Sequence, residues 1–239
     1  MSAKKMLVAL IILLTGTYTS AFIGTGRGTK STKMADFIVN INILSEFSNV
    51  ISGVRCVDHC LQNGACVSVF YRRQHRRCQL HDVLFMSPQD GEQETGTVYY
   101  SVSTGDCPSG YVHNRLLILC YQLHPETILY DDGLADCTSR GEHLVVIDSE
   151  NKQNHLVKQI TSSSDTKPCN YYIDGSDAAN EGHWVFHDGR NMTFFPWAPG
   201  YPLGDSRRDY MLAHRNGNFL WRNAINVNYK HCYICGRDV

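Results

Sequence analysis

The sequence has 239 residues, and its 22 lysines and arginines nearly balance 23 aspartates and glutamates, which gives a formal net charge of −1. A chain without a basic excess does not have the charge typical of a nucleic-acid-binding protein, so we expect no nucleic-acid partner. The ten cysteines are an even number. They are most simply explained by up to five disulfides formed in an oxidising compartment.

The N-terminus has the pattern of a secretory signal peptide over residues 1–21. Two lysines precede nine apolar residues, 6–14, and small residues lie just before Phe22. The apolar run is about half of the ~20 residues that a membrane helix needs. We therefore expect a secreted, extracellular protein without a membrane span, the alternative being an uncleaved anchor. Cleavage would change the formal charge from −1 to −3.

Residues 22–36 are rich in Gly, Ser, Thr and Lys, which predicts a flexible leader. The GTGRG segment within them superficially looks like a phosphate-binding loop. It has no preceding strand in the mature chain, no following amphipathic helix and no Walker-type Gly-Lys-Ser sequence, since Thr29 precedes Lys30, so we do not predict nucleotide binding.

Cysteine spacing divides the remaining chain into two blocks. One block has Cys56, Cys60, Cys66 and Cys78; the other has Cys107, Cys120, Cys137, Cys169, Cys232 and Cys235. A Ser-Thr-Gly turn near 103–106 separates them. We predict an α+β, disulfide-rich protein with two domains, at 37–103 and 107–236.

In the first block, Cys56 and Cys60 are four residues apart and would share one face of a short helix. The segments ACVSVFY and CQLHD then have the composition of two strands joined by a polar turn. This pattern resembles the core of the PAN/apple family. The resemblance implies the pairs Cys56–Cys78 and Cys60–Cys66, although the cysteine pair that joins the ends of that domain in the family is absent.

The polar turn, YRRQHRRC, is unusually basic. It contains Arg72, Arg73, Arg76 and Arg77. Guanidinium groups on a hairpin tip can bind a sulfated or sialylated glycan through salt-sensitive contacts. The alternative is a solvated turn whose charges discourage edge pairing.

The second block begins with a possible hairpin between Cys107 and Cys120. A helix carrying Leu134 and Cys137 on one face should end at Gly141. A short strand, LVVI, and a second helix that starts at the capping sequence DSEN should follow. The rest of the chain has strands broken by Gly and Asp turns.

The order of motifs CPSGY, ADCTSRGEHLVVIDSENKQNHL, YYIDGSDAANEGHWVFHDG, FFPWAPGYP, GNFLWRN and CYIC resembles the C-type lectin-like domain over residues 107–236. The resemblance implies two helices, small antiparallel sheets and a long loop. It also implies a hairpin closed by Cys107–Cys120, as in the long form, and a long-range bridge Cys137–Cys235.

The family's second bridge is missing, because Tyr210 and Asn226 stand at its cysteine positions. Elimination then pairs Cys169 with Cys232. A redox or zinc site at Cys232 and Cys235 is an alternative that we consider weaker, since both have disulfide partners available.

The resemblance also bears on calcium. In sugar-binding members, a Glu-Pro-Asn or Gln-Pro-Asp triplet, a nearby Glu and a Trp-Asn-Asp segment supply oxygen ligands. Here Leu203, Arg208 and Arg222 stand at three of those places, and only Asn223 keeps a side-chain oxygen. Calcium needs six to eight oxygen ligands, so we expect no cofactor and no calcium, unless Asp205 and its neighbour Asp209 rebuild a site.

We hypothesise a metal-free ligand surface on this loop. Its candidate residues are Tyr201, Asn216, Trp221, Arg222 and Asn223. Aromatic and guanidinium groups can bind a sugar or a protein without metal. The alternative is that the tryptophans are core residues.

Asn191-Met-Thr is a permissive N-glycosylation sequon.

The function that the sequence predicts is a secreted recognition protein that binds a carbohydrate or protein ligand. The alternative is a structural or extracellular-matrix interaction protein that binds no sugar. We do not predict an enzyme, since the sequence has no GxSxG or HExxH motif and no cysteine left over as a nucleophile.

Overall fold

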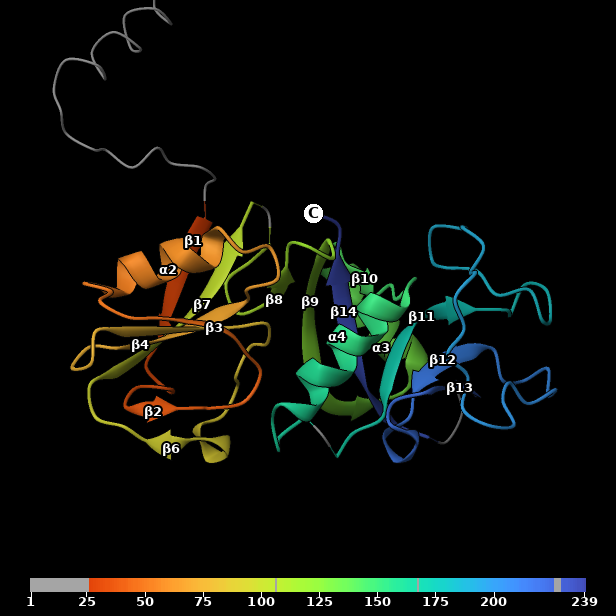
Figure 1. The fold of residues 1–239 in the computed structure, drawn as a ribbon. Helices are drawn as coiled ribbons and strands as arrows, with labels where there is room; N and C mark the ends of the chain where they lie inside the picture. Colours follow the sequence, from red (N-terminus) through yellow and green to blue (C-terminus); the bar gives the residue numbers. More distant parts are fainter. Residues whose placement is uncertain (1–25, 106, 167, 226–228) are drawn as a thin grey trace, which may run out of the picture.

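A computed structural model describes residues 26–105, 107–166, 168–225 and 229–239 (Figure 1). The predicted signal peptide and Asn226 lie outside the described residues. No helix in the described part of the chain is both long and apolar enough to cross a bilayer.

The N-terminal half is built on a five-stranded sheet with the strand order β1-β7-β4-β5-β3. Its strands are β1 (Gly26–Ser31), β3 (Ile43–Phe47), β4 (Ser68–Arg72), β5 (Arg77–His81) and β7 (Thr97–Thr104). Helix α2 (Gly53–Leu61) packs across this sheet (Figure 1). Two short strands, β2 (Phe37–Ile38) and β6 (Glu92–Gln93), pair beside it, and a 3-10 turn, η1, spans Pro88–Asp90.

Helix α2 begins where the sequence provides a cap and buries the face that carries its cysteines. The Ser52 hydroxyl accepts a hydrogen bond from the backbone N–H of Arg55 at 3.3 Å. Cys56, Val57 and Cys60 are the buried residues of the helix. The predicted helix and the two predicted strands of this block are therefore confirmed.

The prediction of a flexible leader is wrong for the residues from 26 onwards, which the structure describes. Residues 26–31 form β1, which pairs antiparallel with β7, and Met34 is buried. The glycines permit close packing here rather than flexibility: a Cβ on Gly28 would lie 2.5 Å from a methyl carbon of Val57, and one on Gly26 would lie 2.3 Å from Leu61. Only glycine lets α2 approach β1 so closely.

The C-terminal half contains a seven-stranded sheet and two helices. The strands are β8 (Val112–Asn114), β9 (Leu119–Ile128), β10 (His143–Leu144), β11 (Tyr171–Ser176), β12 (Tyr210–Ala213), β13 (Trp221–Ala224) and β14 (His231–Arg237). Helices α3 (Tyr130–Ser139) and α4 (Glu150–Thr161) pack beside it, and η2 spans Arg215–Gly217. The long segment between β11 and β12 forms irregular loops at one end of the molecule (Figure 1).

Both predicted helices of this half are present. Gly141 follows α3 with φ +70°, the left-handed conformation that ends helices. Ser149 is the N-cap residue of α4. The predicted strand LVVI is shorter than expected, since only its first residue, Leu144, belongs to β10.

All five predicted disulfides are present. They are Cys56–Cys78, Cys60–Cys66, Cys107–Cys120, Cys137–Cys235 and Cys169–Cys232, with Cα–Cα distances of 5.2 to 6.0 Å. The Cys137–Cys235 bridge joins α3 to β14 across 98 residues. In the chain-entropy account, closing a loop of that length stabilises by up to about 4 to 5 kcal/mol.

The two halves are in direct contact. Buried apolar side chains of the first half, including Phe70 and Phe85, belong to the same core cluster as Leu156 and Ile160 of α4. Arg115, at the β8–β9 turn, donates from Nη2 to the carbonyls of Cys60 and Asn63 at 2.7 Å each, and so caps the end of α2.

Candidate functional site

The candidate ligand surface is formed by the segment 194–209 together with η2 and β13, and hydrogen bonds hold that segment against β13. The backbone of Trp221 bonds to Pro196 and to Ala198, at 2.8 Å in each case. The side-chain amide of Asn223 then accepts from the N–H of Leu203 and donates to its carbonyl, both at 2.8 Å. These bonds fix the backbone of the segment, and the Tyr201–Pro202 peptide bond is cis.

Tyr201 and Arg222 are the two candidate residues that the structure brings together. The guanidinium carbon of Arg222 lies 4.9 Å from the centre of the Tyr201 ring, a cation–π distance. Both residues are partly exposed. Arg222 has no carboxylate partner among the described residues, and its Nε has no hydrogen-bond partner there. This pair can offer a ring face and a positive charge to one ligand.

Two arginines lie close to His214 at this edge of the surface. Burial lowers the pKa of His214, at the end of β12, and the neighbouring charges of Arg222 and Arg215 lower it further. Asn216 is exposed in η2, two residues after His214. The guanidinium groups of these arginines can donate to a polar or anionic group of a ligand.

Trp221 does not belong to the surface, which corrects the hypothesis that it contacts ligand. Its side chain is fully buried, and its indole N–H donates to Oε1 of Gln153 on α4 at 2.9 Å. Phe194 and Trp197 contact it edge to face. Asn223 is also buried, and its amide is committed to the loop backbone. Both residues support the surface from the protein core. The sequence alone does not distinguish this supporting role from direct contact with a ligand.

The loop does not fit calcium at the positions that the resemblance suggested. Asp205 receives two hydrogen bonds from the Arg207 guanidinium, at 2.9 and 3.0 Å, and Arg208 lies 3.4 Å away. The carboxylate of Asp205, which an ion would need as a ligand, is therefore already paired with these two arginines. The oxygen of Asn223 already accepts from Leu203.

A second group of acids lies nearby and was not singled out from the sequence. Asp177 is buried, and its Oδ1 has no hydrogen-bond partner among the described residues. Burial raises the pKa of this carboxyl, and the charge of Asp209 raises it further. Repulsion from Asp177, Asp209 and Asp205 contributes, after desolvation, to a raised pKa of Glu181. The sequence feature that could have indicated this group is the spacing of acidic residues in the segments SDAANEG and DSRRD.

Tyr210 compensates for part of the missing second bridge. At the position where the family has a cysteine, its ring stacks on Tyr130 of α3 with the ring centres 3.7 Å apart. The residue also pairs with Ala224 between β12 and β13. An aromatic contact thus joins the end of the loop to α3.

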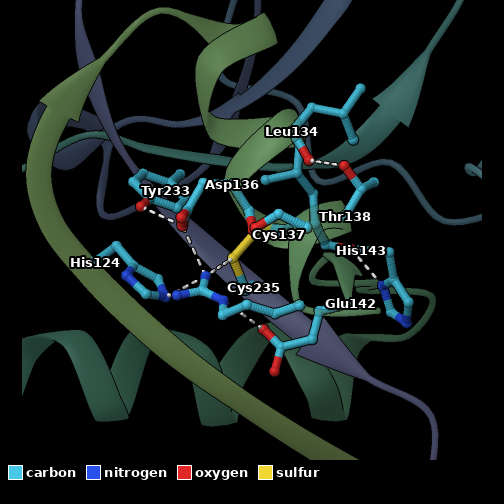
Figure 2. The surroundings of a disulfide bond; sticks show 12 residues. His124, Leu134, Asp136, Cys137, Thr138, Glu142, His143, Tyr233 and Cys235 are labelled. Carbon is cyan, nitrogen blue, oxygen red and sulfur yellow. Dashed lines mark hydrogen bonds and ion pairs between the residues drawn. A yellow bond between two sulfur atoms is a disulfide. The ribbon is translucent and has the colours of Figure 1, made fainter.

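The Cys232–Cys235 segment is not a redox or zinc motif in this structure, because each cysteine belongs to a different disulfide. His124, Asp136 and Cys235 do lie close together (Figure 2). Arg140 fills the space between them: its Nη2 lies 2.7 Å from Asp136, 3.1 Å from His124 and 2.9 Å from the sulfur of Cys235. A cation would have to displace this guanidinium group.

The four arginines of the YRRQHRRC turn differ in their surroundings. Arg72 donates to Glu94 at 2.6 Å, and Arg77 lies 3.4 Å from Glu46. Arg73 and Arg76 are exposed, with no ion pair to a described residue. Asn191, the sequon residue, is also exposed.

Among known proteins, the chain is similar in sequence to several lectins. The chain is 24% identical over 140 residues to the galactose-specific lectin nattectin of Thalassophryne nattereri, covering 57% of this chain and 84% of that protein. It is 25% identical over 134 residues to perlucin of Haliotis laevigata (55% and 83%), and 28% identical over 122 residues to an α-N-acetylgalactosamine-specific lectin of Patiria pectinifera (48% and 72%). No protein-family profile matches.

These relatives support a C-type lectin-like domain in this chain. Three of the five disulfides, Cys107–Cys120, Cys137–Cys235 and Cys169–Cys232, lie within residues 107–236. They are lectins and lectin-like binding proteins rather than enzymes.

Proposed function

We propose that the protein is an extracellular recognition protein whose C-type lectin-like domain binds a carbohydrate or protein ligand, without calcium in the loop 194–209. Similarity to galactose-specific and N-acetylgalactosamine-specific lectins supports a carbohydrate ligand. We also propose that the first sheet and α2 form a PAN/apple-like module.

One observation carries the binding proposal: the Arg222 guanidinium lies over the Tyr201 ring, on a loop that Asn223 holds in place. A sugar can stack on the tyrosine ring while the guanidinium donates to its oxygens. Because both groups belong to ordered elements, little conformational entropy is lost on binding.

The experiment is a glycan array on the disulfide-bonded protein, with and without a chelator. We expect binding that the chelator leaves unchanged. Arg222→Ala should weaken the strongest signal about tenfold, because it removes a charged donor and a cation–π pair.

Arg190→Ala is a matched control. Arg190 lies 5.3 Å from the Phe186 ring, a similar cation–π pair outside the loop. Its loss should leave binding unchanged. Signal lost in chelator would contradict the calcium-free mode. Absence of any glycan signal would contradict the carbohydrate ligand and favour a structural role through protein contacts.

A further inference from the structure

The turn between β4 and β5 carries two kinds of arginine. Arg72 and Arg77 face each other across the two strands, where like charges repel. Two glutamates relieve that repulsion: Glu94 lies 2.6 Å from Arg72, and Glu46 lies 3.8 Å from Arg72 and 3.4 Å from Arg77. This pair of arginines therefore belongs to the framework of the hairpin.

Arg73 and Arg76 follow and precede that pair in the sequence, and they form the two ends of a tight turn. The N–H of Arg76 donates to the carbonyl of Arg73 at 3.3 Å, which closes a four-residue turn. The Cα atoms of such residues lie within about 7 Å of each other. The carbonyl of Arg76 accepts from Val50 at 2.8 Å, so the turn is anchored to the segment before α2.

We infer that Arg73 and Arg76 form a binding site for the sulfate groups of an extracellular sulfated glycan. The site goes beyond the proposed ligand surface on the loop 194–209 and is independent of it. Two guanidinium groups without acidic partners, on an anchored turn, can engage neighbouring sulfates through charge-assisted hydrogen bonds. A sulfated glycan is favoured over nucleic acid because five disulfides indicate an oxidising compartment.

The alternative of a purely protective charge fits less well. Charges that discourage strand association belong on an edge strand, and here the edges of the first sheet are β1 and β3. β4 and β5 are inner strands, so their turn has no edge to protect.

The test is binding to immobilised heparin as a function of salt. Arg73→Gln combined with Arg76→Gln should weaken the affinity about tenfold at 0.15 M salt and flatten its salt dependence. The control is Arg27→Gln combined with Lys30→Gln, which removes the same charge from exposed positions of β1 in the same half. The control should retain the wild-type affinity.

Both double variants replace exposed side chains, so their thermal melting should match that of the wild type. Equal losses in the turn variant and the β1 control would show that the charge acts without a defined site, and would overturn the inference. Failure of the wild type to bind heparin, or equal binding to desulfated heparin, would also overturn it. Binding to phosphatidylserine vesicles but not to heparin would assign the turn to a membrane surface instead.

Discussion

The side-chain amide of Gln159 on α4 satisfies both backbone groups of Leu84: it accepts from the N–H and donates to the carbonyl, each at 2.7 Å. The two residues are 75 positions apart and belong to different halves of the chain. Gln159 is fully buried. Nearby, Lys158 donates to Asp82 at 2.5 Å. A buried polar contact of this kind fixes the position of one half against the other.

Removing the amide should therefore destabilise the whole protein. Gln159→Leu leaves a buried N–H and a buried carbonyl without partners, and we expect a loss of about 2 to 4 kcal/mol in the free energy of unfolding. Urea unfolding measures this loss. The control is Gln62→Leu at an exposed position, which should change stability by less than about 0.5 kcal/mol. Similar small effects of both substitutions would show that the contact between the halves contributes nothing.

Stability should fall as the pH decreases from neutral. Burial lowers the pKa of His81, His113 and His155 to about 4, from an unfolded value near 6.5. Between these values the unfolded chain binds more protons than the folded one, so the stabilisation present above pH 6.5 is lost as the pH falls towards 4.

Each histidine contributes at most about 1.4 kcal/mol per pH unit in that window. Urea unfolding at pH 7, 6 and 5 should show the decline, and His155→Gln should make it shallower. An unchanged slope in this variant would mean that His155 binds its proton equally well in the folded and the unfolded protein, and would contradict the lowered pKa.

Local signals predicted much of this fold. Cysteine spacing, the family resemblance and elimination together predicted all five bridges, and Gly141 and the DSEN cap marked the helix ends correctly. The leader was misjudged, because its composition is typical of a linker while its glycines serve packing under α2.

Contacts between residues far apart in the sequence could not be predicted from it. Nothing near Gln159 indicates that its amide reaches Leu84, and no motif separates the buried Trp221 from a sugar-stacking tryptophan. At the candidate site, the sequence predicted the loop and its arginines. In the turn between β4 and β5, the sequence did not predict that Arg72 and Arg77 are neutralised, because their partners Glu46 and Glu94 lie elsewhere in the sequence, in β3 and just after β6.

Ile118 is a position where substitution should stabilise the protein. It has φ +52°, a conformation that is unfavourable for a β-branched residue, and its side chain is 68% exposed. Ile118→Asn should raise the free energy of unfolding by about 1 kcal/mol, since asparagine tolerates this region. The control is Leu116→Asn, which is equally exposed (69%) without positive φ and should have little effect. Thermal melting compares the two, and a destabilised Ile118→Asn would show that its packing outweighs the backbone strain.

Calcium at millimolar concentration should not raise the thermal stability of the protein. A site occupied at a hundred times its Kd would add about 2.7 kcal/mol to the folded state. Here Leu203 and Arg208 stand where oxygen ligands are needed, Asp205 is paired with Arg207, and the oxygen of Asn223 is bonded to the loop backbone. Differential scanning calorimetry with calcium, and then with chelator, measures the effect, with magnesium at the same ionic strength as the control. An increase of several degrees that only calcium produces and chelator reverses would show that other acids, beginning with the buried carboxyl of Asp177, bind the ion.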